Sequence, residues 1–590
     1  MNTSKPRLVL LLLAASLLLT GCLSPQTPGE KCTVLFEENK DLYISLRSCT
    51  IDRFDEISVT VGVPKGQRIS SVNYPRYSVS ARTGSSPNFD YYTVTLYQLR
   101  YSTVIRFTTA EAYTTAYHPG DGTGQTITVQ EESPHLYFNT LPYRQQFSRE
   151  GYLPIGWNTA PDGTGTPVGF GSRIDHTNVS HLDLYMQWLP CTPAEAFSYR
   201  IDNGQVTIIA YHGSGDVIIP EQLGGMPVTG IARGAFGDLN VGTLALPATL
   251  TTVEAGAFGY VTADKLYLFD NLDTLSEYCF AGYSIRSVHI QAIRDPVYSG
   301  SYFDTFADKM DYLDSLKDFQ KMVLLNGSAA RFGYDSTKLE QAFPDYRVVN
   351  MGVYAYANML PQTELVLGAM QAGDILLSAP ELDAIPQQFC GSNALDRETF
   401  CMMESNYDLF SRLDCRNYTG LFESFHVYNQ ERQDMPARSY LESPSDYDED
   451  GNRQLTPTYN RQGDYILYRP DNPKGKVFGV KRAYFDPQYI TDNDIAGLNR
   501  VYDAFAAKGV RVFFTYSPRS RISISDSSTP EAIRSLDTLL RSRLHATVIS
   551  APEDALMDPL YFYGTDNHLS TAGVAIYTRQ VIQFLQTVLE

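Results

Sequence analysis

The sequence predicts a multidomain chain in which all-β modules precede a C-terminal α/β domain with a parallel sheet, and three observations predict it. Short runs that alternate apolar and polar residues, separated by Gly, Pro and Asn clusters, fill residues 31–191. Phenylalanines recur at a spacing of 22 residues within 197–292. Within 300–590, apolar strand-like runs alternate with amphipathic helical stretches, a pattern typical of a parallel sheet that helices cover on both faces.

The N-terminal segment is a targeting signal and not part of the fold. A short basic stretch is followed by the apolar run Leu8–Thr20, which is shorter than the about 20 residues that span a bilayer and is typical of a secretory signal. The run ends in Leu19-Thr20-Gly21-Cys22, which resembles the lipobox of bacterial lipoproteins. The resemblance implies a signal peptide over 1–21, lipidation of Cys22 and a tether over 22–30. The alternative is an ordinary signal peptide in which Cys22 is incidental.

If Cys22 is lipidated, the protein is exported and anchored to the bacterial membrane, facing the cell exterior or the periplasm. The formal net charge of −19 disfavours a nucleic-acid partner and an anionic-lipid surface, because an acidic protein does not neutralise phosphates. We therefore expect contact with the membrane through the lipid anchor only. The spacing of the cysteines matches no metal-binding pattern, so we expect no metal and no cofactor.

Cysteines in an exported chain are candidates for disulfides. Cys32 with Cys49 is one candidate pair, and one pair among Cys390, Cys401 and Cys415 is another. The connectivity cannot be deduced from the sequence alone.

Residues 31–112 predict a small β-sandwich-like domain, because runs such as 57–61 and 92–97 alternate apolar and polar side chains. They contain no motif that carries chemistry. The next segment, 113–191, contains the stretches Tyr117-His118-Pro119-Gly120-Asp121-Gly122-Thr123-Gly124, Leu141-Pro142-Tyr143, Phe147-Ser148-Arg149-Glu150-Gly151-Tyr152, Gly156-Trp157-Asn158, Asp162-Gly163-Thr164-Gly165-Thr166 and Leu184-Tyr185-Met186-Gln187-Trp188.

In their order and spacing these stretches resemble the internalin B-repeat family, which implies a small β-rich module of a bacterial surface protein. Both Trp residues of the chain, Trp157 and Trp188, fall within this segment. They could bind a ligand, but two Trp residues in one small module more often form its core.

A true repeat fills residues 197–292. Phe236, Phe258 and Phe280 are each 22 residues apart, as are Leu244, Leu266 and Val288. A period of this length with a strand-like Leu-x-Leu step predicts a solenoid, in which each turn buries its apolar face against its neighbours. The pattern resembles the surface-adhesin class of leucine-rich repeats. This implies either a concave face that binds a surface protein partner or a purely structural spacer.

Residues 300–590 form the predicted α/β domain, which is interrupted by an insertion at about 385–475. We expect strands at 322–325, 347–351, 375–378, 510–516 and 546–549, and helices at 336–343, 365–370, 492–508, 530–544 and from about 570 to the C-terminus. In such a sheet, ligand groups gather beyond the carboxyl ends of the strands. Ser328, Gly352 and Glu381 follow the first three strands, while Asp566 and His568 follow the last. We therefore expect all five residues to meet at one edge of the sheet.

A serine, a histidine and a carboxylate are the groups that nucleophilic catalysis requires. Four stretches of this region carry a resemblance to a known family. They are Asn326-Gly327-Ser328-Ala329-Ala330-Arg331-Phe332-Gly333-Tyr334-Asp335-Ser336, Val348-Val349-Asn350-Met351-Gly352-Val353, Tyr459-Asn460-Arg461-Gln462-Gly463-Asp464-Tyr465 and Phe562-Tyr563-Gly564-Thr565-Asp566-Asn567-His568-Leu569-Ser570. Together they resemble a cell-surface branch of the SGNH (GDSL-like) hydrolases, which have a flavodoxin-like α/β fold.

The resemblance assigns roles to residues of this chain. Ser328 would be the nucleophile, His568 the base and Asp566 the carboxylate that orients it, while the N–H groups of Ser328 and Gly352 would form the oxyanion hole. The third block of the family, G-x-N-D, is absent, since the third strand ends in Ser378-Ala379-Pro380-Glu381. A side-chain oxyanion donor is therefore unassigned, and Asn358, Glu381 and Asn460 are further candidates for polar site residues.

Two functions remain open at this stage. The first is a cell-surface serine esterase or O-acyltransferase that acts on O-acyl groups, above all acetyl groups, of an extracellular or cell-wall glycan through a Ser328 acyl-enzyme. The second is a non-catalytic surface adhesin, in which the repeats bind a partner and the α/β domain is a degenerate scaffold. In that case Gly327-Ser328 is an ordinary turn and His568 a surface residue.

Overall fold

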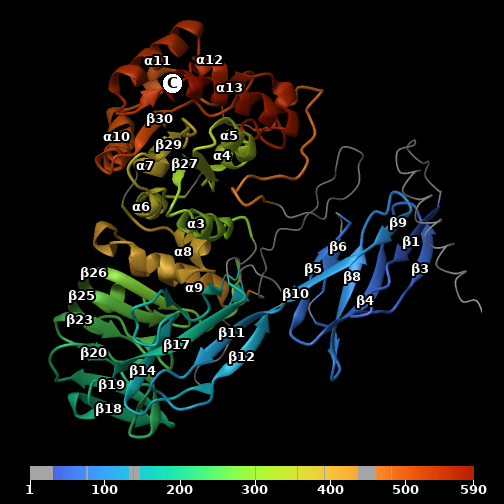
Figure 1. Ribbon diagram of the computed structural model, residues 1–590. Coiled ribbons are helices and arrows are strands. Elements are labelled where there is room, and N and C mark those ends of the chain that lie inside the picture. Colours follow the sequence, from blue (N-terminus) through green and yellow to red (C-terminus); the bar gives the residue numbers. More distant parts are fainter. Residues whose placement is uncertain are drawn as a thin grey trace, which may run out of the picture.

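The computed structural model describes residues 31–589 apart from 75–76, 81, 132–136, 139–145, 175, 177–178, 299–300, 355–356, 391–392, 436–458 and 480–481. The lipobox-like stretch 19–22 and the stretch 141–143 lie outside the described residues. The structure is multidomain, with several sheets, some of them parallel, and a mixed α/β composition. Figure 1 shows the β-rich regions in blue to green and the helix-rich C-terminal region in yellow to red.

The first β region packs its sheets around one apolar cluster. Its strands include β1 (Lys31–Phe36), β3 (Ser48–Asp52), β4 (Ile57–Pro64), β8 (Phe89–Leu96) and β9 (Thr103–Ile105), in sheets ordered β3-β1-β9 and β2-β4-β8-β6, with β2 (Tyr43–Ile44) and β6 (Tyr77–Val79). The antiparallel register of β1 and β3 sets Cys32 opposite Ile51 and Cys49 opposite Val34. Both thiols are free, so the predicted Cys32–Cys49 disulfide is wrong. The two cysteines lie on the same face of the sheet but are offset by two residues in the register. Such diagonal neighbours are about 7–8 Å apart, which is too far for a disulfide.

The second β region uses its tryptophans as core. Its main sheet has the order β12-β11-β17-β14-β15, from β11 (Tyr113–His118), β12 (Ile127–Glu131), β14 (Tyr152–Asn158), β15 (Pro167–Val168) and β17 (His181–Pro190). Trp157 is 1% exposed and contacts Tyr117, Phe147 and Phe170 edge-to-face. The half-buried Trp188 donates its indole N–H to the backbone oxygen of Pro119 at 2.9 Å. Both indoles therefore serve the internal packing of this region.

In the repeat region, successive turns pair in parallel. The strands β23 (Leu239–Ala245), β25 (Phe258–Phe269) and β26 (Phe280–Gln291) lie side by side, so that Leu244, Leu266 and Val288 are in register. The expected column of phenylalanine rings is present and buried. Its ring centroids are 4.8 Å apart between Phe236 and Phe258, and 5.1 Å apart between Phe258 and Phe280. The last ring is covered by Phe422 of the insertion, at 4.4 Å.

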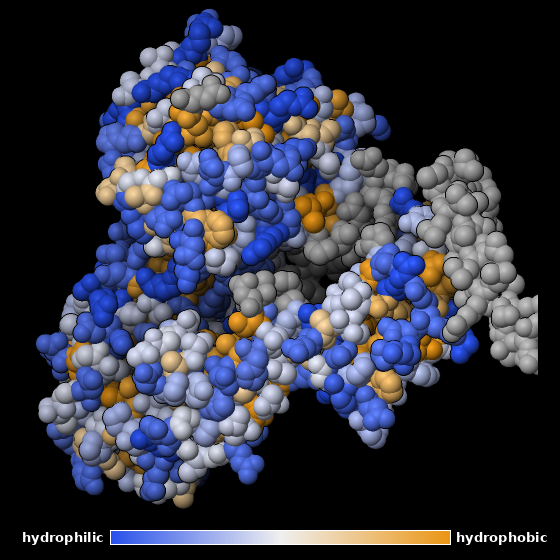
Figure 2. Space-filling view, viewed as in Figure 1, coloured by the Kyte–Doolittle hydropathy of each residue, from blue (hydrophilic) through white to orange (hydrophobic). Residues whose placement is uncertain are grey.

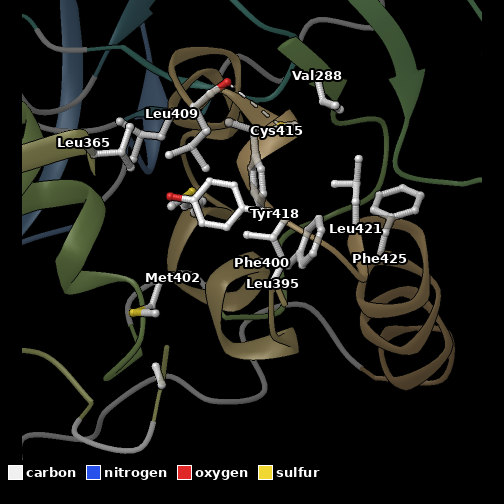
Figure 3. Close-up of a cluster of buried hydrophobic side chains, with 14 of the residues drawn as sticks. Val288, Leu365, Leu395, Phe400, Met402, Leu409, Cys415, Tyr418, Leu421 and Phe425 are labelled. Carbon is white, nitrogen blue, oxygen red and sulfur yellow. Dashed lines mark hydrogen bonds between the residues drawn. The ribbon is translucent and has the colours of Figure 1, made fainter. Parts of the chain in front are cut away.

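The insertion is a packed element between the repeats and the α/β region. It contains α7 (Ile385–Phe389), α8 (Arg397–Met403) and α9 (Leu421–Arg432). Figure 3 shows its side chains, among them Phe400 and Leu421, in one apolar cluster with Val288 of β26 and Leu365 of α6 (Leu360–Ala369). The cysteines of the insertion, at positions 390, 401 and 415, are free, so the predicted disulfide among them is also wrong.

The α/β region is built on a five-stranded parallel sheet. Its order is β28 (Tyr346–Asn350), β27 (Gln320–Leu325), β29 (Ile375–Ser378), β30 (Arg511–Phe514) and β32 (Thr547–Val548). Along β27 the side chains alternate between two clusters. Met322 and Leu324 pack with α5 (Ser336–Ala342) and α13 (Thr571–Leu589), while Val323 and Leu325 pack with α6, α10 (Asp492–Ala507) and α11 (Pro530–Arg543). The sheet is therefore covered on both faces.

The strand order reverses direction beside β27. In sheets of this order, ligands bind at the carboxyl ends of the strands on either side of that switch point.

Among the described residues, no helix is long and apolar enough to cross a membrane. Figure 2 shows apolar residues scattered in small patches over a mostly hydrophilic face.

Candidate active site

Ser328 and His568 meet at the carboxyl edge of the sheet. Ser328 opens the one-turn helix α4 (Ser328–Arg331), which follows β27 directly, and His568 lies in the loop before α13. The Oγ of Ser328 and the Nε2 of His568 are 2.9 Å apart, although 240 positions separate the two residues. This is the hydrogen bond through which a histidine removes the proton of a serine nucleophile.

The imidazole of His568 is held by its surroundings. The ring of Phe332 packs on it with centroids 4.2 Å apart, and the His568 backbone N–H donates to Thr565 Oγ1 at 2.9 Å. Burial, followed by the positive charges of Arg469 and Arg331, lowers the pKa of His568 to about 3. At neutral pH the ring is therefore uncharged, and its Nε2 can accept a proton.

Asp566 does not orient His568 in this structure. Its carboxylate accepts hydrogen bonds from the backbone N–H groups of Phe478 and Gly479, at 3.2 and 2.8 Å. Between these described residues, no hydrogen bond or ion pair joins Asp566 to His568. The expected pair is absent because these two backbone N–H groups take the Asp566 carboxylate, while the Thr565 hydroxyl accepts the backbone N–H of His568.

Gly352 is not the expected oxyanion donor either. Its N–H donates to the side chain of Asn350 at 3.0 Å. A Cβ at Gly352 would lie 2.3 Å from the backbone nitrogen of Arg331, so the glycine is required for the close packing of this loop on α4. The backbone N–H of Ser328 has no acceptor in the described part of the chain, which leaves it available to an oxyanion.

A cleft of about 600 Å³ opens at Ser328 and His568. It is lined by Tyr302, Phe303, Ser328, Tyr354, Glu381, Asp383, Ala384, Gly479, Arg519, Thr565, Asp566, Asn567 and His568. Sequence reasoning identified the serine, the two carboxylates at 381 and 566, and the histidine of this set. It missed Tyr302, Phe303, Tyr354, Asp383 and Arg519, which belong to no motif. For Tyr354, Asp383 and Arg519 the one signal is their position a few residues after β28, β29 and β30, whereas Tyr302 and Phe303 follow no strand of this sheet.

Glu381 holds the turn that carries Ser328. Its carboxylate accepts the backbone N–H of Ala329 at 2.8 Å, which fixes the turn that presents Ser328. Burial raises the pKa of Glu381. Because the Glu381 carboxyl group accepts the N–H of Ala329, that N–H cannot serve an oxyanion.

Asn358 and Asn460 are structural and do not line the cleft. Asn358 donates to the backbone oxygen of Ala394 at 2.8 Å and accepts the N–H of Leu360 at 3.0 Å. Asn460 donates to Asp464 at 3.0 Å. The buried carboxylate of Asp464 also accepts from Ser336 and Asn350. The segment 459–465 therefore ties the end of the insertion to β28 and α5.

Among the described residues, no group of His, Cys, Asp and Glu side chains could hold a metal ion. No protein-family model matches the chain, and no curated protein is significantly similar to it. The geometry of the site is therefore the basis for assigning a function to this chain.

Proposed function

We propose that this protein is an exported, lipid-anchored serine esterase or O-acyltransferase of the SGNH type, which acts on acyl groups, above all acetyl groups, of an extracellular or cell-wall glycan. The observation that carries the proposal is the 2.9 Å contact between Ser328 Oγ and His568 Nε2 in an open cleft. The order of the sheet and the position of the serine after its first strand support an SGNH-type domain. On this proposal the preceding β modules and leucine-rich repeats place the enzyme at the cell surface.

The reaction begins when Ser328 Oγ attacks the carbonyl carbon of the ester and its proton passes to Nε2 of His568. The negative charge that develops on the carbonyl oxygen is met by the N–H of Ser328. When the tetrahedral intermediate collapses, the sugar hydroxyl leaves with the proton from His568, and the acyl group stays on Ser328. Water then releases the acid in an esterase, whereas a second glycan hydroxyl takes the acyl group in a transferase.

A second candidate function is a non-catalytic surface adhesin. It is favoured by the carboxylate of Asp566 and the N–H of Gly352, both of which are engaged away from His568 and Ser328. A degenerate site would retain the serine–histidine contact without turnover, and the repeats would bind the partner.

The two functions are distinguished by covalent trapping with a fluorophosphonate probe. We expect the purified wild-type chain to be labelled at Ser328 and to release acetate from p-nitrophenyl acetate. The Ser328→Ala and His568→Ala variants should lose turnover, because each removes one half of the proton-transfer pair. Ser542→Ala, which alters an exposed serine of α11, is the matched control and should behave as wild type. A folded wild-type chain that is neither labelled nor active would favour the adhesin.

A further inference from the structure

One wall of the cleft is aromatic. Tyr302 and Phe303 lie just before α3 (Thr305–Ser315), and Tyr354 lies in the loop after β28. Their rings meet edge-to-face, with centroids 6.3 Å apart between Tyr302 and Tyr354 and 5.6 Å apart between Phe303 and Tyr354. The buried guanidinium of Arg331 packs 3.5 Å from the Tyr302 ring centroid. The three half-buried rings thus form a fixed apolar surface in the cleft that holds the nucleophile.

The cleft also contains an ion pair that offers donors and acceptors side by side. Arg519 Nη2 lies 3.2 Å from Asp383 Oδ2. The Arg519 residue is only 9% exposed, so the ion pair is a fixed part of the cleft wall. Since each hydroxyl both donates and accepts, neighbouring sugar hydroxyls suit a guanidinium beside a carboxylate.

The charge of the lining excludes one class of glycan. The cleft is lined by three carboxyl groups, those of Glu381, Asp383 and Asp566, and by one guanidinium, that of Arg519. His568 is uncharged at neutral pH. The excess of carboxyl groups repels a polymer that carries carboxylates or phosphates. A cleft of about 600 Å³ is within the size range of small-ligand sites.

We propose that this cleft is a subsite for an uncharged pyranose ring, which packs a C–H face on the aromatic wall of Tyr302, Phe303 and Tyr354 and places its hydroxyls on Asp383 and Arg519. The subsite deepens the proposed function and rests on it, because the acyl ester would be carried by the sugar bound here. The preferred substrate is therefore an acylated neutral glycan rather than an acylated uronate or a phosphate-bearing polymer.

The test compares two acetylated probes on the full chain. Wild type should release acetate from O-acetylated xylo-oligosaccharides with a kcat/KM at least about tenfold higher than from O-acetylated oligogalacturonates. In Tyr354→Ala, the ratio of kcat/KM for the xylo-oligosaccharide to that for p-nitrophenyl acetate should fall about tenfold through KM. Tyr484→Ala, an exposed tyrosine outside the cleft, should keep the wild-type ratio. Equal use of both probes, or an unchanged ratio in Tyr354→Ala, would overturn the subsite.

Calorimetry separates failure of the subsite from failure of the proposed function. The Ser328→Ala chain cannot turn over an ester but keeps the cleft walls, so it should bind the neutral oligosaccharide and not the uronate. Adding Tyr354→Ala to this variant should weaken the binding about tenfold. If wild type proves inactive on every ester while the neutral probe still binds, the enzymatic function fails and the subsite stands. If the esters are cleaved but the neutral oligosaccharide does not bind, the subsite fails and the enzymatic function stands.

Discussion

The low pKa of His568 predicts an unusual pH dependence of ester hydrolysis. The kcat/KM reports the protonation of the free enzyme, and His568 must be neutral to accept the proton of Ser328. With a pKa lowered to about 3, about 99% of His568 is neutral at pH 5, whereas a histidine with the ordinary pKa of about 6.5 is only about 3% neutral there. The expected kcat/KM for p-nitrophenyl acetate is therefore nearly equal at pH 5 and pH 8, instead of about thirtyfold lower at pH 5.

The assay follows acetate release over this pH range, with Ser328→Ala at each pH as the blank for uncatalysed hydrolysis. The sign follows from the lowered pKa, because activity is present above the pKa and lost only as the pH falls through about 3. A midpoint near 6 to 7 would refute the reasoning. It would mean that a carboxylate stabilises the imidazolium in solution, and thus that Asp566 leaves the amides of Phe478 and Gly479.

Asp566→Asn should keep one of the two hydrogen bonds to the 478–479 backbone and lower kcat on p-nitrophenyl acetate by less than about tenfold, whereas an orienting carboxylate in a triad contributes about 10⁴-fold. Phe258→Ala should lower the free energy of unfolding of the repeat region by about 3–5 kcal/mol, as measured by urea denaturation. The reason is that the ring is 2% exposed and is stacked on both sides. Substitution of the exposed Tyr260 by Ala is the control. Cys22→Ser should release the chain from membranes, and mass spectrometry of the wild type should find acyl chains on Cys22; an unmodified soluble wild type would contradict the anchor.

The parts of the fold that follow from local patterns could be predicted from the sequence. The apolar run in β27 gave a strand that is buried on both faces, and the 22-residue spacing gave the column around Phe258. Helix α10 begins where the sequence places it, because Thr491 and Asp494 cap each other's backbone N–H groups. The contact between Ser328 and His568 was also predictable, since parallel strands bring their carboxyl ends to one edge.

The parts that depend on the path of a loop could not be predicted in this way. The Asp566 carboxylate accepts the backbone N–H groups of Phe478 and Gly479, which lie 88 and 87 residues before it in the sequence, so no local pattern indicates its direction. At Gly352 a local hydrogen bond excludes the oxyanion role, because the side chain of Asn350 accepts the backbone N–H of Gly352. That second pattern is visible in the sequence as a common turn of asparagine, and it could have been weighed against the oxyanion role.

Contacts from the insertion hold the aromatic wall of the cleft in place. The serine and the histidine lie on the sheet and its last loop, but the aromatic wall is fixed by the insertion. Glu404 accepts the backbone N–H groups of Val297 and Tyr298, and the Tyr298 ring packs on Phe303, at 5.8 Å.

The loop that carries Tyr354 is held in the same way. Downstream in that loop, Asn358 donates its backbone N–H to Asp396 and its side chain to Ala394, both in the insertion. Arg432 of α9 is buried against Asp270 of the repeat region, so the insertion is in turn braced by the repeats. Substitutions at Glu404 and Asp396 should therefore change which glycan is accepted before they change how the ester is cleaved. Arg469, near the end of the insertion, is different, because it acts on His568 itself.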